Sequence, residues 1–471
     1  MRALNEDPGG ALMLQIDNGS ATKNCQGITR RTALKAGFCG LLGLSLADML
    51  KLQARATETS RNKSVILMWL DGGPSHMETY DPKPEAPTEY RGPYGVINTN
   101  VPGIRIADIL PRHARHADKM VFLRSMHHDN GDHFAGAHWM LTGRFGSNAA
   151  NLPQMYPSVG SYIARCLGPN QPGLPAYVGL PSAQSVYLFP GYMGSAYLGA
   201  QYNPFDVDRE QRYLGANYNI RIGTPRQLQS VLQTQGSTMQ DRMSLMRSLD
   251  TMRRDLDRSG TMDAMDRYQQ QAVDLILSPR ARDAFDIDRE DPRLADRYGT
   301  GPWGRYTLMA RRLVEAGVTF VTVDMPHWDD HSNIKDGHGY KLPHVDRAVG
   351  GLLEDLSERG LFNDVLLIVM GEFGRTPRIN TGQPGIPIPG RDHWGNAFSV
   401  LLAGGGLRTG QVVGETNSRG ERPIRRAVRP HDLLQTVYRW LGIDVSQTFR
   451  DHTGRPHAVL DQGAPIQEIL G

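Results

Sequence analysis

The stretch Val65-Ile66-Leu67-Met68-Trp69-Leu70, followed at once by Asp71-Gly72-Gly73, decides the fold of this 471-residue chain. Six apolar side chains in a row before a turn are typical of a strand that is buried on both faces of a sheet. Similar runs recur along the chain and alternate with helical patterns, which predicts an α/β domain with a doubly wound, mostly parallel sheet. The other runs are residues 120–123, 176–178, 318–323, 365–370 and 398–402, and the clearest helical patterns are 306–316 and 345–359.

Composition excludes several classes of protein. The chain is 39% hydrophobic and 21% charged, which suits a globular protein with a sizeable core. Three cysteines are too few for a disulfide scaffold or for a zinc site built from four thiolates. No stretch of about 18 uninterrupted apolar residues occurs, so the sequence predicts no stable membrane span in the mature protein.

The first 56 residues have the features of an export signal. Arg30-Arg31 precedes a modest apolar run over residues 36–47, and Ala54-Arg55-Ala56 offers a small-residue cleavage site. The paired arginines resemble a twin-arginine signal, which would make the export machinery a partner and the location periplasmic or extracellular. The alternative is an amphipathic first helix. Residues 57–471 form the predicted mature domain.

The net charge of the whole chain, +3, comes from this leader. Residues 1–56 hold seven basic and four acidic side chains, and the rest of the chain holds 45 of each. A formally neutral domain has no net positive field to attract phosphates, so we expect no nucleic-acid partner.

Residues 224–296 differ from the rest of the chain. Leu245, Leu249, Met252 and Leu256 recur at helical spacing, with charged residues between them. Such a stripe is typical of a packed helix rather than of a cofactor site. We therefore predict a helical insertion without chemistry of its own.

All 15 histidines follow residue 56, and eight of them fall in two groups, at positions 127–138 and 327–344. Histidine binds metals and transfers protons, although a single histidine is more often structural. Five motifs with such residues lie beside predicted strands, and in open α/β sheets the carboxyl ends of the strands build the sites. Each motif alone also fits a turn or a solvated polar loop. The motifs are 70–76, 132–144, 324–331, 371–375 and 390–394.

Taken in order, these motifs resemble a known family. The sequences LDGGPSHMETYDPKP, TGR, WDDH, VMGEFGRTP and GRDHW are similar to those of the exported family called domain of unknown function 1501, over roughly residues 60–465. That family is sulfatase-like and belongs to the alkaline phosphatase superfamily. The resemblance implies a fold of that type, with the helical insertion added to it.

The resemblance also implies a metal site at the carboxyl edge of the sheet, holding one or two divalent ions such as zinc, manganese or calcium. The matching ligand positions are Asp71, Asp329, His331, Glu372 and His393. His133 occupies the position of the sulfatase nucleophile, and Arg144, with Arg375 as a second candidate, matches a clamp for the oxyanion.

The function that follows is an exported metal-dependent hydrolase of sulfate or phosphate esters, acting on small molecules or glycans. Two positions depart from the pattern: His133 replaces a hydroxyl or thiol nucleophile, and Phe373 replaces a histidine. His133 would then be a ligand, a general acid or base, or a phosphate acceptor, and a single-metal site fits better than two metals. The alternative is a non-catalytic binding or scaffold protein on this fold.

Overall fold

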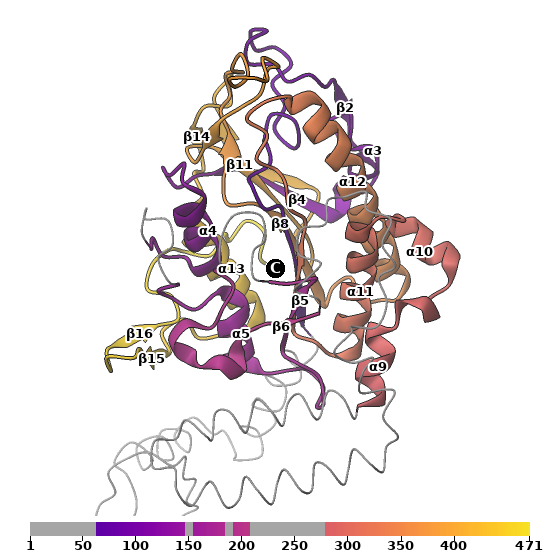
Figure 1. The fold of residues 1–471 in the computed structure, drawn as a ribbon, viewed down its shortest axis with the longest axis vertical. Helices are drawn as coiled ribbons and strands as arrows, with labels where there is room; N and C mark the ends of the chain where they lie inside the picture. Colours follow the sequence, from indigo (N-terminus) through magenta and orange to yellow (C-terminus); the bar gives the residue numbers. More distant parts are fainter. Residues whose placement is uncertain (1–62, 147–153, 184–191, 208–277) are drawn as a thin grey trace, which may run out of the picture. The chain divides into compact units, whose positions relative to one another are not determined.

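A computed structural model describes residues 63–146, 154–183, 192–207 and 278–471 (Figure 1). The predicted leader, residues 1–56, lies outside the described residues, as do residues 224–277 of the predicted insertion. The described remainder of that insertion contains helix α9 (Pro279–Phe285) and the first five residues of helix α10 (Pro292–Tyr298).

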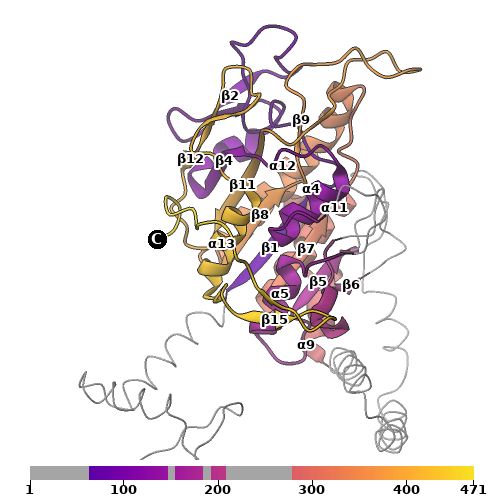
Figure 2. The ribbon, with the colours of Figure 1, turned by 90° about the vertical axis from the view of Figure 1, so that its left-hand side faces the viewer.

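An eight-stranded sheet forms the centre of the molecule, in the order β12-β4-β11-β8-β1-β7-β5-β6 (Figures 1 and 2). Neighbouring strands run parallel, except that β11 is antiparallel to both β4 and β8. The predicted α/β class with a mostly parallel sheet is therefore confirmed, and all six predicted strands form. The strands are β1 (Ser64–Trp69), β4 (Met120–Met126), β5 (Tyr177–Leu180), β6 (Phe205–Asp206), β7 (Phe320–Asp324), β8 (Val365–Met370), β11 (Phe398–Gly404) and β12 (Gln411–Val413).

Helices cover both faces of this sheet. Figure 1 shows α4 (His133–Thr142), α5 (Val159–Leu167) and α13 (Pro430–Leu441) on one side, and α9, α10, α11 (Pro302–Ala316) and α12 (Ile334–Glu358) on the other. Such two-sided cover explains why β1 is apolar at nearly every position. Its alternate residues face two different cores.

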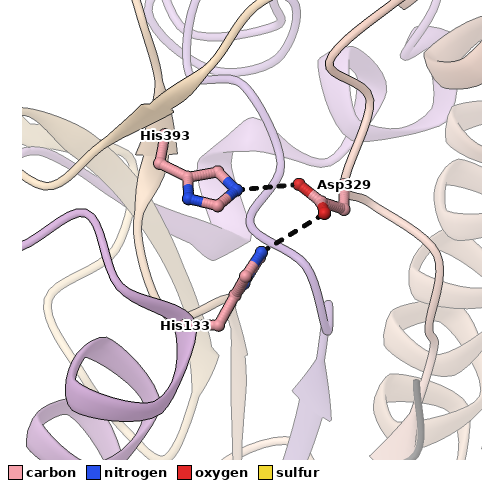
Figure 3. Close-up of side chains that lie close together, drawn as sticks. All are labelled: His133, Asp329 and His393. Carbon is pink, nitrogen blue, oxygen red and sulfur yellow. Dashed lines mark hydrogen bonds and ion pairs between the residues drawn. The ribbon is translucent and has the colours of Figure 1, made fainter. Parts of the chain in front are cut away.

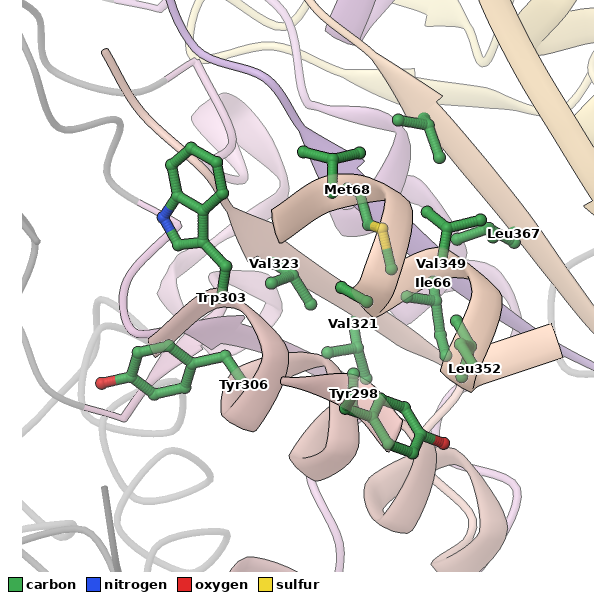
Figure 4. Packing of buried hydrophobic residues seen from close by; sticks show 14 of the residues in the cluster. Ile66, Met68, Tyr298, Trp303, Tyr306, Val321, Val323, Val349, Leu352 and Leu367 are labelled. Carbon is green, nitrogen blue, oxygen red and sulfur yellow. The ribbon is translucent and has the colours of Figure 1, made fainter. Parts of the chain in front are cut away.

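The core between the sheet and helices α10 to α12 is drawn in Figure 4. Ile66 and Met68 of β1 and Val321 of β7 reach it from the sheet, and Trp303 and Leu352 reach it from the helices. Each of these side chains is at most 1% exposed. Burying one side chain of this kind stabilises the fold by roughly 1.5–3 kcal/mol.

Shorter elements surround the sheet. Helix α3 (Pro111–Arg115) packs against α12, and the described loops contain four two-stranded sheets. These sheets are β2 (Val96–Asn98) with β3 (Arg105–Ala107), β9 (Gly374–Arg375) with β10 (His393–Trp394), β13 (Glu415–Thr416) with β14 (Pro423–Arg425), and β15 (Thr448–Arg450) with β16 (Pro456–Ala458).

The register of the central strands brings three loop segments to one edge of the sheet. Trp69, at the end of β1, pairs with Asp324 of β7 and with Met370 of β8, so these three parallel strands end side by side. The segments that follow them carry Asp71, Asp329 and Glu372. Among the described residues, no helix has the length and apolarity needed to cross a membrane.

Candidate metal centre

Two histidines and one carboxylate converge at this edge of the sheet (Figure 3). His133 is the first residue of α4, Asp329 lies in the loop after β7, and His393 lies on β10. One potential ligand atom from each lies within 4.8 Å of the other two. Within the described ranges, this is the one group of three or more histidine, cysteine or acidic residues with that geometry.

Asp329 lies at the centre of the cluster. Its Oδ1 is 2.9 Å from Nε2 of His393 and 3.0 Å from Nε2 of His331, and its Oδ2 is 3.4 Å from Nε2 of His133. The Nε2 atoms of His331 and His393 are themselves 2.9 Å apart. Three imidazole nitrogens therefore face one carboxylate.

The opposite ring nitrogen of each histidine is held by an acceptor. Nδ1 of His133 lies 2.5 Å from Oε1 of Glu372, Nδ1 of His331 lies 2.7 Å from Oδ1 of Asp392, and Nδ1 of His393 lies 2.7 Å from the carbonyl oxygen of Gly131. An acceptor at Nδ1 fixes a proton there in the neutral ring, which leaves a lone pair on Nε2. Histidine ligands of metals are held in the same way.

This donor set fits a divalent cation. Three Nε2 lone pairs and a carboxylate that face one another repel unless positive charge lies among them. In the metal-free protein protons supply that charge: burial disfavours the charged ring, but hydrogen bonds to Asp329 and Glu372 outweigh burial and raise the pKa of His133 to about 9. Burial alone would raise the pKa of Asp329, but hydrogen bonds from the three histidines outweigh it and hold that pKa below its usual range.

Local sequence explains how His133 and His393 reach the cluster. Oδ1 of Asp132 accepts a hydrogen bond from the backbone N–H of Ala135, which caps α4 and places His133 at its first position. Phe373 packs against both imidazoles, with ring centroids 4.8 Å from His133 and 4.7 Å from His393. The phenylalanine that replaces an expected histidine therefore forms an apolar wall of the site.

Glu372 and Asp71, two predicted ligands, lie beside the cluster rather than within the group of three. Glu372 is buried behind His133 and accepts hydrogen bonds from the backbone N–H of Gly72 at 3.0 and 3.1 Å. Asp71 is also buried, and its carbonyl oxygen accepts the N–H of Trp328 at 3.0 Å. Glu372 thus orients a ligand histidine, and Asp71 joins the end of β1 to the Asp329 loop.

Arg144 is not brought to the cluster. Its guanidinium pairs with Asp461 at 3.1 Å, donates to the carbonyl of Ala458 at 2.9 Å and packs on the ring of Tyr156. Helix α4 separates it from His133, and ten helical residues span about 15 Å. Arg144, eleven residues after His133, therefore lies just beyond the far end of this helix.

Two acidic residues of the site lie in the predicted motifs 324–331 and 390–394 but were not predicted individually as site residues. Asp392 stands next to His393 in GRDHW, and this adjacency could have indicated it. Asp324 ends β7 and is 1% exposed, and neither of its carboxylate oxygens has a hydrogen-bond partner among the described residues. Burial, with the nearby charges of Asp71 and Glu372, raises the pKa of Asp324 well above its usual value.

Several solved structures are similar to this chain in outline. They include the phosphonate monoester hydrolase of Agrobacterium radiobacter (11% identity, 86% of this chain and 77% of that chain, TM-score 0.40) and the lipoteichoic acid synthase LtaP from Listeria monocytogenes (11%, 88% and 81%, 0.38). A third is the PsFucS1 sulfatase from a Pseudoalteromonas species (14%, 84% and 70%, 0.33). At this identity and overlap their activities do not carry over to this chain.

A comparison with curated proteins found no match. The family comparison gives a clear result, because one family model matches residues 62–470, nearly the whole of the chain that follows the predicted leader. That match agrees with the resemblance carried by the five motifs. The chain belongs to the family described as protein of unknown function (DUF1501).

Proposed function

We propose that this protein is a metal-dependent hydrolase of sulfate or phosphate esters, with its site at the His133, Asp329 and His393 cluster. The observation that carries the proposal is the convergence of three imidazole Nε2 atoms on one carboxylate, each ring held from behind at Nδ1. A structural salt bridge does not need three such histidines. Histidines that bind a metal through Nε2 are usually oriented by an acceptor at Nδ1, as these are.

His133, Asp329 and His393 would hold the metal, with His331 beside them. The imidazole nitrogens favour zinc over calcium, which prefers oxygen ligands, and the carboxylate of Asp329 also suits manganese. A divalent metal bound there would act as a Lewis acid towards the oxyanion of the ester. Arg144 lies away from the cluster and Arg375 has no solvent contact, so the proposal includes no arginine clamp.

The residues of the chain would bind, orient and move protons. The side chains of His331 and His393 are 24% and 23% exposed, against 9% for His133, so substrate would approach from their side. With no hydroxyl or thiol at position 133, water is the attacking group: its oxygen bonds to sulfur or phosphorus, and the bond to the alcohol oxygen breaks. The proton that the water loses replaces the proton that His331 gives to the leaving oxygen. His331, supported by Asp392 at Nδ1, is placed to pass a proton from Nε2 to the leaving oxygen.

The test combines metal content with turnover. The wild-type protein is purified without chelators, its metals are quantified by mass spectrometry, and aryl sulfate and aryl phosphate hydrolysis is assayed with zinc, manganese or calcium added. We expect about one zinc or manganese per chain and measurable hydrolysis of one ester class. Asp329→Asn removes the central charge and should abolish both. A metal-free wild type that is inactive with every added metal would reject the proposal.

A second candidate, a non-catalytic binding or scaffold protein, is favoured by one observation: a histidine stands at the position of the nucleophile. It would be supported by a wild-type protein that binds metal and sulfate or phosphate but turns over neither ester. Turnover separates the two candidates, and calorimetry with the free anions on the metal-loaded protein shows whether the site binds them.

We further propose export by the twin-arginine route, with the mature enzyme in the periplasm or outside the cell and sulfated or phosphorylated small molecules or glycans as substrates. The support is the Arg30-Arg31 motif with the apolar run that follows. The N-terminus of protein from the exported fraction should map near residue 57. Replacing both arginines by lysine should retain the uncleaved chain in the cytoplasm.

A further inference from the structure

The arginine of the GEFGR motif has no role in the proposed chemistry, yet it is one of the most buried charges in the protein. The side chain of Arg375 is 0% exposed. It lies on β9, directly opposite His393 of β10 in the antiparallel pair. An arginine without solvent contact cannot capture a substrate anion from outside, so its charge serves groups inside the protein.

The guanidinium of Arg375 joins the segments that build the site. Nε donates to the carbonyl of Gly73 at 2.9 Å, and Nη2 donates to the carbonyl of Gly72 and to Oδ1 of Asp329 at 2.6 Å. Nη1 lies 3.4 Å from the carbonyl of Arg391, just before β10. One side chain thus ties the turn after β1 to the Asp329 loop and to the strand of His393.

Gly72 connects Arg375 to the side of the cluster where His133 lies. Its carbonyl accepts from Arg375, while its N–H donates to Glu372, which in turn holds Nδ1 of His133. Gly72 has φ of +111°, and a Cβ there would lie 2.7 Å from the backbone nitrogen of Asp329. The turn therefore has no room for a side chain at position 72, and the contacts to Arg375 and to Glu372 both depend on this glycine.

We propose that Arg375 is a positioning residue, which fixes Asp329 directly and His133 through Gly72 and Glu372, so that the metal ligands are held in place before the metal binds. This inference rests on the proposed function for its consequence in metal affinity. The inference also predicts that the histidines are ordered without metal, and this ordering can be measured on the metal-free protein.

The test uses Arg375→Lys, which keeps the charge but offers a single nitrogen in place of the planar fork that reaches several acceptors. Arg311→Lys is the matched control: Arg311, on α11 and away from the site, is 1% exposed and pairs with three carboxylates. Zinc affinity is measured by competition with a chelating dye. The imidazole ¹⁵N signals of the metal-free proteins report the tautomer and order of His133, His331 and His393.

We expect Arg375→Lys to bind zinc about 10- to 100-fold more weakly, as is typical when a group that orients metal ligands is lost. We also expect the imidazole signals to shift or broaden, whereas Arg311→Lys should lower the melting temperature and leave affinity and signals unchanged. Unchanged affinity and signals in Arg375→Lys, or equal changes in both variants, would overturn the inference.

Two further outcomes are decisive. If Arg375→Lys does not fold, Arg375→Gln is used, because its amide can still donate to Gly73; failure of both to fold would make Arg375 a residue of the core and reject the positioning role. If wild-type protein binds no metal, the proposed function fails, and the imidazole signals alone then decide the inference.

Discussion

Nδ1 of His133 and Oε1 of Glu372 lie 2.5 Å apart, in a part of the site where the glutamate side chain is 1% exposed and the histidine 9%. A charge-assisted hydrogen bond in such a place is strong, and it fixes the orientation of the ring. The pair also links two segments that are 239 positions apart in sequence. We therefore expect the charge of Glu372 to affect both zinc affinity and catalysis.

Glu372→Gln should weaken zinc binding and reduce kcat/KM by about 10- to 100-fold. The amide can still accept from Nδ1, but it loses the negative charge that makes the imidazole a better ligand. The measurement is zinc competition together with ester hydrolysis. Glu354→Gln is the control, since Glu354 pairs with His116 at 3.0 Å away from the cluster. If Glu372→Gln has the same zinc affinity and the same kcat/KM as the control, Glu372 does not support the metal site.

Added metal should stabilise the folded protein in an order set by ligand chemistry. At 100 times its dissociation constant, a metal that binds only the folded state adds about 2.7 kcal/mol, or roughly 3 °C in a chain of this length. We expect that increase with zinc or manganese and none with calcium, by differential scanning fluorimetry. His393→Ala should abolish it, whereas His457→Ala, on the β15–β16 hairpin, should not. A shift that survives in His393→Ala would place the metal elsewhere.

Acid should weaken the anchoring of helix α3 to α12. Asp346 of α12 accepts hydrogen bonds from Nδ1 and the backbone N–H of His113, at 2.6 and 2.8 Å, and from the N–H of Arg112 at 3.0 Å. Burial raises the pKa of Asp346, but these contacts outweigh it and lower the pKa below its ordinary value. The resulting stabilisation is fully present above about pH 4, which is the pKa of an aspartate in the unfolded chain. It is lost as the pH falls through the lower pKa that Asp346 has in the folded protein.

Asp346→Asn should therefore cost about 1–3 kcal/mol at pH 7, and the difference from wild type should shrink below pH 4. Urea unfolding at a series of pH values measures both. Other carboxylates titrate in both proteins and cancel in the difference. If the difference in unfolding free energy between the two proteins stays constant down to pH 3, the stabilisation by Asp346 does not depend on its charge.

The core between α12 and the sheet should be sensitive to truncation. Leu352 is fully buried in that core, and Leu352→Ala is expected to cost about 2–5 kcal/mol in the free energy of unfolding. Ile424→Ala is the matched control because Ile424 is 58% exposed, and its effect should stay within about 0.5 kcal/mol. Chemical denaturation compares the two, and a similar loss in both would contradict the packing described for α12.

The strands could be predicted from sequence because their signal is local. A strand covered on both faces must be apolar at nearly every position, and β1 and β8 are. Parallel strands also place their following residues at one edge, so the sequence alone assigns Asp329 and Glu372 to a common region. The antiparallel direction of β11 could not be predicted, because hydrophobicity does not encode strand direction.

The details of the site depend on contacts that sequence does not show. Nδ1 of His393 is held by the backbone carbonyl of Gly131, and a carbonyl acceptor leaves no trace in residue identity. Arg144 shows the opposite problem. The resemblance implies an oxyanion clamp at this position, but helix α4 places the arginine away from the cluster. The sequence presents Arg375 only as a candidate anion clamp, because its complete burial arises from segments that converge in the folded chain.

The place of β1 in the sheet has a consequence for how the chain is made. This strand is synthesised first among those of the sheet, yet Val65 pairs with Phe320 on one side and Leu366 on the other. A ribosome must translate the chain as far as Phe320 before the first strand gains either neighbour. Until then an almost entirely apolar segment has to be shielded from other chains, and we expect release from the ribosome, rather than early synthesis, to set the pace of folding.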